Sequence, residues 1–272
     1  MKRLIPFIFF MALIPIAAYA WTAHYYNHDD LPGGKGMFST TTIKKDMQVE
    51  GDLLIWYWIL CDPDSAAWHN IVACREWDPG EAWMVRITNS EGDIRLVLSC
   101  DGSADENAGF NSDICLPDGA EEWHFVTHLY NYVGAATSAV SHFMDGSLID
   151  EDTGLCGPLH PNTAPIDIFH SVGNNPWEGG ILYVGIAEGD IASWFVEAHH
   201  SWMYNNRGHI HSEIKANAGV SLWCTWPMNP AMGIPNYGEC TNKTDGTTYR
   251  YDMQLESGIP DVRTQGAVLG TN

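Results

Sequence analysis

Residues Asp52–Leu60 read DLLIWYWIL, and residues Trp123–Tyr130 read WHFVTHLY. Both runs are short, dense in aromatic and β-branched side chains, and free of glycine and proline, a composition that favours strands over helices. Similar runs recur along the chain between clusters of Gly, Pro, Asn and Asp, and long helical periodicity is scarce. This rhythm predicts an all-β protein.

The same pattern extends in both directions and predicts about a dozen strands without β-α-β alternation. One helical patch is expected at 207–216, where Ile210 and Ile214 are spaced i, i+4. We therefore expect a two-sheet antiparallel jelly-roll sandwich with one short helix near the C-terminal third. The further strand candidates are Met37–Ile43, Asn70–Glu76, Ala82–Thr88, Ile94–Ser99, Ser138–Met144, Ile166–Val172, Ile181–Ala187, Val220–Trp226, Thr247–Asp252 and Val262–Val268.

The composition is that of a folded and strongly acidic protein. Its 272 residues are 45% hydrophobic and 17% charged, with 13 Lys+Arg against 34 Asp+Glu and a net charge of -21. If Lys2 and Arg3 are removed with a leader segment, 11 basic and 34 acidic side chains remain, a net charge of -23. A surface with this negative charge repels phosphate groups, so nucleic acids and anionic membrane surfaces are disfavoured as partners.

The N-terminus has the pattern of a signal peptide. Two basic residues precede the apolar run Leu4–Ala18, and Ala18-Tyr19-Ala20 has the small-x-small form of a cleavage site. The alternative, an uncleaved membrane anchor, is disfavoured because the run is shorter than the roughly 17–25 residues of a spanning helix. We expect residues 1–20 to be removed, leaving a single secreted or surface-exposed domain, 21–272, without a membrane span.

Seven cysteines in a secreted chain predict disulfides. Spacing favours the pairs Cys61–Cys74, Cys100–Cys115 and Cys224–Cys240, each of which closes a loop of 12 to 15 residues, and leaves Cys156 unpaired. Loops of this size each gain on the order of 3 kcal/mol in the chain-entropy model. Thiolate metal ligation is the weaker alternative, because the sequence contains no C-x-x-C pair.

From residue 51 to 215 the order of motifs resembles the concanavalin A-like lectin/glucanase fold, in particular its laminin-G-like branch. The resemblance implies a jelly roll that recognises carbohydrate or a surface partner. Two segments depart from it: 188–206, before the expected helix, and the C-terminal extension 216–272. The motifs that carry it are Leu54-Ile55-Trp56-Tyr57-Trp58, the hairpin Ala82–Ser99, Glu122-Trp123-His124-Phe125-Val126, His142-Phe143-Met144-Asp145-Gly146, Ser171-Val172-Gly173, Trp177-Glu178-Gly179-Gly180-Ile181 and His211-Ser212-Glu213-Ile214.

Catalytic residues are not assigned. Glucanases of that fold use a strand with two paired glutamates, and the three Glu-Gly-Asp sequences, at 50–52, 91–93 and 188–190, lack the second one. Polysaccharide lyases of the same fold use Arg, His, Tyr and Lys instead. Strand alternation turns Arg86, Arg95 and His128 away from the apolar positions, where they would bind and deprotonate a uronic acid. The alternative is that all three are ordinary solvent-facing side chains.

The 12 Trp and 11 Tyr residues exceed the needs of one core. An exposed aromatic ring can stack on the apolar C–H face of a sugar while a nearby polar group binds its hydroxyls. Trp68, Trp77 and Trp177 lie next to turn signals and are the candidate ligand-binding residues. Packing within the core or under a loop is the alternative for each of them.

Calcium is the cofactor that the sequence suggests. The acidic stretch 101–113 offers carboxylates at Asp101, Asp105 and Asp113, and Ca²⁺ takes six to eight oxygen ligands. The resemblance implies the same, since relatives of this kind often hold Ca²⁺ at a sheet rim. Plain solvation of acidic side chains is the alternative.

A second cluster of polar residues consists of His199, His200, His209 and His211. These histidines lack the i, i+4 spacing that places two metal ligands on one helical face. The sequence therefore favours surface polarity over a metal site here.

Taken together, these features favour a secreted, non-catalytic recognition domain that binds carbohydrate or a surface partner, with calcium as a candidate aid. A polysaccharide lyase or glycoside hydrolase on the same fold is the first alternative. A structural subunit of a surface or virion assembly is the second. Fold resemblance alone does not choose between them.

Overall fold

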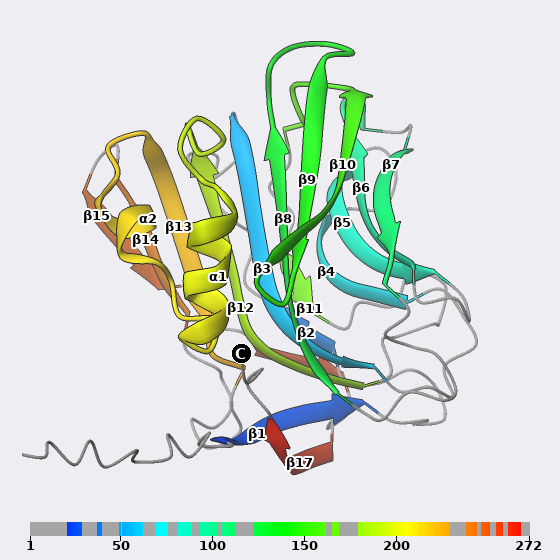
Figure 1. The fold of residues 1–272 in the computed structure, drawn as a ribbon, viewed down its shortest axis with the longest axis vertical. Coiled ribbons are helices and arrows are strands. Elements are labelled where there is room, and N and C mark those ends of the chain that lie inside the picture. The colour runs from blue at the N-terminus through cyan, green and yellow to red at the C-terminus, as the bar shows by residue number, and fades with distance from the viewer. Residues whose placement is uncertain are drawn as a thin grey trace, which may run out of the picture.

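The computed structural model describes residues 21–28, 37–39, 49, 51–61, 69–75, 81–88, 93–102, 105–112, 122–161, 165–168, 179–228, 238–243, 246–250, 254–257 and 261–267. Two antiparallel sheets stack face to face, as predicted for an all-β sandwich (Figure 1). The expected signal peptide, 1–20, lies outside the described residues. Among the described residues, no helix is long and apolar enough to cross a membrane.

The first sheet has 10 strands and carries the helices on its outer face. Its main path is β10 (Ser147–Leu155), β9 (Ser138–Met144), β8 (Trp123–Asn131), β3 (Asp52–Cys61), β12 (Gly179–Gly189), β13 (Val220–Trp226), β14 (Glu239–Asn242) and β15 (Thr247–Arg250). Strand β1 (Trp21–His28) pairs with β12 and with β17 (Asp261–Ala267). The C-terminal extension therefore belongs to the same sandwich, because β13 to β15 continue the first sheet.

The second sheet has seven strands, in the order β16 (Gln254–Ser257), β2 (Met37–Ser39), β11 (Ile166–Ile168), β4 (His69–Arg75), β5 (Glu81–Thr88), β6 (Asp93–Ser99) and β7 (Asp105–Asn111). Its inner face meets the inner face of the first sheet. In β5, for example, Trp83, Val85 and Ile87 point into the space between the sheets and are buried there.

The central strand β3 is buried on both faces, which is why it reads as a nearly unbroken apolar run. Leu53, Ile55, Tyr57 and Ile59 belong to the core between the sheets, while Leu54, Trp56, Trp58 and Leu60 belong to a second core on the outer face. Because a strand alternates its side chains between two faces, two separate cores are needed to bury all eight.

Two helices among the described residues, rather than the one expected, cover that outer core (Figure 1). Helix α1 (Glu197–Asn205) forms in the segment that departed from the resemblance, and α2 (Ser212–Ala216) occupies only the end of the predicted patch 207–216. Met203 of α1 and Ile214 of α2 are fully buried in the outer core. Burial of these side chains, rather than a long amphipathic repeat, fixes the helices in place.

Among the described residues, the disulfides confirm one of the predicted pairs and correct the rest of the assignment. Cys224 and Cys240 are bonded, as expected, with their Cα atoms 4.1 Å apart on paired strands β13 and β14. Cys100 is bonded to Cys156, so the predicted Cys100–Cys115 pair and the unpaired Cys156 are wrong. Cys74 takes part in neither bond, contrary to the Cys61–Cys74 prediction; the Cys61 side chain lies outside the described residues.

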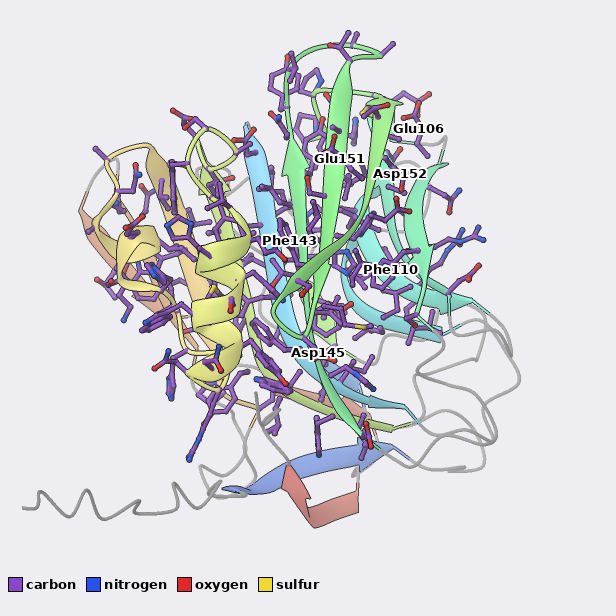
Figure 2. The ribbon with its side chains drawn as sticks, in the orientation of Figure 1. Glu106, Phe110, Phe143, Asp145, Glu151 and Asp152 are labelled. Atoms are coloured by element: carbon purple, nitrogen blue, oxygen red, sulfur yellow. A yellow bond between two sulfur atoms is a disulfide. The ribbon has the colours of Figure 1, made fainter. Side chains whose placement is uncertain are left out.

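The Cys100–Cys156 bond has a clear spatial cause. Residues 105–111 are not a loop but strand β7, the edge of the second sheet, which meets β10 at the edge of the first. Two hydrogen bonds also cross this junction: the N–H of Cys156 donates to Glu106, and the N–H of Gly109 donates to Asp152. The two accepting residues, Glu106 and Asp152, are labelled in Figure 2. The disulfide therefore joins two sheets whose edges are already in contact.

Candidate binding site

A cavity of about 180 Å³ opens on the outer face of the first sheet, between β12, β13 and the connection from α1 to α2. Buried residues form its floor, and partly or fully exposed ones form its rim. Its lining includes Trp56, Tyr183, His209, Lys215, Thr225 and Pro227. Of these residues, the sequence had pointed to His209 alone as a candidate, and it favoured surface polarity there.

Tyr183 reaches this cavity through an irregularity in β12. The pairing of β12 with β3 shifts register between Leu182 and Gly185, and Tyr183 has a φ of 47°, in the left-handed region. Its N–H donates to the carbonyl oxygen of Pro227, another lining residue, at 3.1 Å. Bulges of this kind re-aim a side chain, and strained backbone at a non-glycine residue often marks a functional site.

Trp56 forms the floor of the cavity and is fully buried. Its indole lies across Gly185, where a Cβ atom would be only 2.1 Å from the ring, so this position admits no larger residue. The Trp56 Nε1–H makes no hydrogen bond to any described residue. A buried donor without a partner costs about 1–3 kcal/mol.

The rim comes from the turn that ends α1. Arg207 and Gly208 both have positive φ values, 63° and 77°, and the Gly208 N–H donates to the Met203 carbonyl at 2.8 Å. A Cβ at Gly208 would lie 2.8 Å from the Trp58 indole nitrogen, so glycine is needed for the turn to sit this close to the sheet. The turn delivers His209 to the cavity.

The polar groups of the rim are His209, Lys215 and Thr225. The His209 ring lies 5.3 Å from the Tyr183 ring, centroid to centroid. Burial, and then the positive charges of Arg207 and Lys215, lower the pKa of His209 below its usual 6.5. The imidazole is therefore neutral at pH 7, with one hydrogen-bond donor and one acceptor. The Lys215 ammonium lies 4.8 Å from the centre of the Trp223 ring.

The residues predicted for ligand and metal binding are placed elsewhere or not described. Trp68, Trp77 and Trp177 lie outside the described residues. Asp101 is exposed, the side chain of Asp105 is not described, and Asp113 lies outside. Most of the stretch between them is strand β7, so a flexible calcium loop is not what these residues form.

The structure separates the three residues of the lyase alternative. His128 is fully buried between the sheets. Arg86 and Arg95 lie on the outer face of the second sheet, where Arg86 donates to Asn107 and Arg95 to Asp93. The prediction that the three share a catalytic face is wrong, because it treated one face of β8 as open to solvent when both faces are covered.

His128 instead belongs to a buried polar chain. The Tyr57 hydroxyl lies 2.9 Å from Nε2 of His128, whose Nδ1 lies 2.8 Å from Nδ1 of His142. Nε2 of His142 lies 3.4 Å from the Asp152 carboxylate. Burial, and then His142, hold the pKa of His128 well below its usual range, while burial lowers that of His142 to about 4. Both imidazoles are neutral at pH 7.

Asp52, from the first of the three Glu-Gly-Asp sequences, is a structural residue. Its carboxylate accepts hydrogen bonds from the N–H groups of Tyr132, Ile191 and Ala192, at 2.7 to 2.9 Å. The side chain is 7% exposed and serves two loops at once. It ties the β8–β9 turn to the segment that leads into α1.

His200, one of the clustered histidines, is also structural. It is buried between the rings of Phe125 and Phe143, accepts from the Gly146 N–H through Nε2 and contacts the Thr127 hydroxyl through Nδ1. Burial lowers its pKa to about 3. It attaches α1 to the first sheet.

Comparison with known proteins gives likenesses at the level of fold. No family model matches the sequence, and no curated protein does. A native heptameric SAP-like pentraxin from Limulus polyphemus matches with 12% identity and a TM-score of 0.47, over 68% of this chain and 82% of that one. The binding domain of botulinum neurotoxin DC in complex with SialylT matches with 14% identity and a TM-score of 0.45, over 70% of this chain and 47% of that one. The same domain in complex with rat synaptotagmin II matches with 15% identity and a TM-score of 0.43, over 68% of this chain and 46% of that one. The chain thus spans less than half the length of the toxin domains.

Proposed function

We propose that the protein is a secreted, non-catalytic recognition domain that binds a carbohydrate in the cavity between β12, β13 and the α1–α2 connection. The observation that carries the proposal is the bulge at Tyr183. A residue with a strained backbone places a partly exposed aromatic ring at a cavity whose floor is a fully buried indole.

The chemistry of the lining suits a sugar ring. The volume of about 180 Å³ is below the range of roughly 300–1,000 Å³ that holds drug-sized ligands, so a single ring of a larger glycan is the expected occupant. Tyr183 offers an aromatic face for sugar C–H groups. The neutral His209 and the Thr225 hydroxyl offer hydrogen-bonding partners for sugar hydroxyls.

The lining supports binding rather than hydrolysis. Glycoside hydrolysis uses two carboxylates that flank the scissile bond. The described lining contains none; its charged side chain is Lys215. A lysine beside an aromatic ring also favours glycans that carry a carboxylate, since the ammonium would pair with it.

Secretion is part of the proposal. Two disulfides among the described residues support an oxidising compartment, and the N-terminal pattern supports a cleaved leader. We expect the secreted protein to begin at Trp21. N-terminal sequencing of the protein purified from a secreting host tests this, and an intact leader would contradict it.

A glycan array with the secreted full chain, followed by calorimetry on the best ligand, tests the binding site. Tyr183→Ala is expected to raise Kd about tenfold, which corresponds to a loss of about 1.4 kcal/mol. Its melting temperature should stay close to that of the parent, because the ring is only partly buried. Tyr132→Ala is the matched control, since Tyr132 is also partly exposed but lies at the β8–β9 turn. Equal losses in both variants, or no glycan bound by a folded protein, would contradict the proposal.

A further inference from the structure

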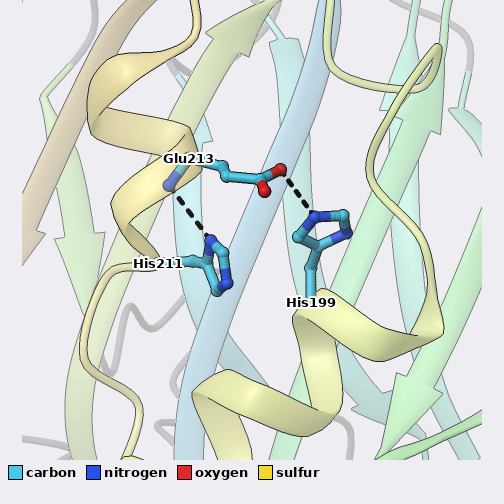
Figure 3. Close-up of side chains that lie close together, drawn as sticks. All are labelled: His199, His211 and Glu213. Atoms are coloured by element: carbon cyan, nitrogen blue, oxygen red, sulfur yellow. Dashed lines mark hydrogen bonds and ion pairs between the residues drawn. The ribbon is translucent and has the colours of Figure 1, made fainter.

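We propose that His199, His211 and Glu213 form a binding site for a divalent transition-metal ion, with Zn²⁺ as the best match. The site lies where α1 faces the start of α2 and is independent of the carbohydrate proposal (Figure 3). One ligand atom from each side chain can be chosen so that all three lie within 4.8 Å of one another. Two imidazoles and one carboxylate, with a fourth position open to water, form a known zinc ligand set.

The two imidazoles already have a suitable arrangement. Their ring centroids are 4.9 Å apart, and the rings are nearly perpendicular, at 85°. Two histidines on one tetrahedral zinc, with Zn–N bonds of about 2.0–2.1 Å, place their ring centroids about 5 Å apart. The third group, the Glu213 carboxylate, lies 2.7 Å from Nε2 of His199. A metal ion would replace that hydrogen bond.

Aromatic neighbours hold both rings. Phe195 stacks on His199 with centroids 5.6 Å apart, and Trp194 meets the same ring edge-on at 5.4 Å. Trp202 meets His211 edge-on at 4.6 Å. Packing of this kind fixes the orientation of the ligands before a metal arrives, which lowers the entropy lost on binding. The site is nevertheless reachable, since the Glu213 side chain is 56% exposed.

The sequence hid this cluster because its two histidines are not neighbours on one helix. His199 lies in the first turn of α1, whereas His211 is the N-cap residue of α2. The turn at Arg207 and Gly208 reverses the chain between them and brings the two helix starts together. A search for i, i+4 ligands along the sequence cannot detect such a pair.

Proton positions give the proposal a specific signature. Without metal, Nδ1 of His199 accepts from the Val196 N–H and Nδ1 of His211 accepts from the Glu213 N–H, each at 3.1 Å. A ring nitrogen that accepts carries no proton, so each ring holds its proton on Nε2. Ligation through Nε2 moves each proton to Nδ1, through solvent and without net proton release, and both backbone N–H groups lose their acceptor. The metal thus competes with two helix caps.

Zinc titration of the full chain, without a polyhistidine tag and against a chromophoric chelator, tests the site. Removal of one ligand, in His211→Asn or Glu213→Gln, is expected to weaken Zn²⁺ binding by about 100-fold or more. Asn retains N-cap capacity at position 211, and Glu213 is exposed, so both variants should fold. Equimolar Ca²⁺ or Mg²⁺ should not displace the zinc.

His124→Asn is the matched control. His124 also pairs with a carboxylate, that of Asp145 at 2.6 Å, and its variant should bind zinc as the parent does. In ¹⁵N spectra, zinc should move the proton of both imidazoles to Nδ1 and shift the Val196 and Glu213 amides. Zinc affinity that is equal in the parent and Glu213→Gln, or imidazole tautomers that zinc leaves unchanged, would overturn the proposal.

Discussion

His128 and His142 lie directly opposite each other on β8 and β9, with their Nδ1 atoms 2.8 Å apart and both side chains fully buried. Two neutral imidazoles can share that contact only if one donates and the other accepts. The Asp152 carboxylate, which can only accept, faces Nε2 of His142, and this favours the tautomer in which Nδ1 of His142 accepts from His128 and Nε2 of His128 accepts from the Tyr57 hydroxyl. His142 then carries its proton on Nε2, which faces Asp152.

The buried histidines predict acid sensitivity. Burial lowers the pKa of His142 to about 4 and that of His200 to about 3, from 6.5. Below pH 6.5 the unfolded chain binds protons that the folded chain does not. Stability is therefore complete above about pH 6.5 and falls as the pH drops toward 4, by about 1.4 kcal/mol per pH unit for each such histidine. Urea unfolding between pH 7 and 4 measures this.

His200→Gln is the informative variant for that prediction. It should be less stable than the parent at pH 7, because the Gly146 N–H and the Thr127 hydroxyl lose a well-placed partner. Its stability should nevertheless change less between pH 6.5 and 4, since one titrating group is gone. His209→Asn removes an imidazole whose pKa is lowered less than that of His200, so it should reduce the pH dependence by less than His200→Gln does. If His200→Gln is less stable than the parent by the same free energy at every pH, then His200 does not titrate in this range.

Asp52→Asn should destabilise the fold by about 3 kcal/mol. The carboxylate accepts three backbone N–H groups, and an amide supplies one acceptor oxygen and turns an N–H₂ group toward these donors. Carbohydrate affinity of the folded fraction should stay the same, because Asp52 does not line the cavity. Asp190→Asn, at an exposed acidic residue in the same segment, is the control. Loss of binding without loss of stability would assign Asp52 a functional role instead.

The two disulfides should contribute unequally to stability. Cys100–Cys156 closes a loop with a sequence separation of 56 and should contribute about 4 kcal/mol, against about 3 kcal/mol for the separation of 16 at Cys224–Cys240. Denaturant unfolding of the two double Cys→Ser variants compares them. Peptide mapping under non-reducing conditions should recover Cys100 with Cys156, and recovery of Cys100 with Cys115 would contradict the structure.

The calcium prediction is tested by a melt at constant ionic strength. If Asp101 and Asp105 hold Ca²⁺, a hundredfold excess over Kd should stabilise the fold by about 2.7 kcal/mol, and Asp101→Asn with Asp105→Asn should abolish the gain. Added Ca²⁺ is a better probe than a general chelator, because a chelator would also act at the proposed zinc site of His199. A melting temperature that Ca²⁺ leaves unchanged assigns these acids to solvation alone.

Local sequence pattern determined the architecture. Runs such as Asp52–Leu60 and Trp123–Tyr130 are strands because aromatic and β-branched side chains suit a buried pleated sheet, and the turn residues between them set the breaks. The Cys224–Cys240 bond was predictable for the same reason, since the two cysteines lie on strands that follow each other in the chain, β13 and β14. These features depend on residues that are close together in the chain, so they can be predicted from the sequence.

Contacts between distant segments decided the rest. Strand β7 meets β10 in the folded molecule, and for this reason Cys100 bonds Cys156 rather than Cys115, which is nearer in the sequence. The sequence could not show that contact. Alternation fixes which residues of a strand share a face, but only packing decides whether that face is covered, as it is around His128. The bulge at Tyr183 and the turn at Gly208 likewise arise where separate segments meet, so the cavity and the His199–His211 pair exist only in the folded molecule.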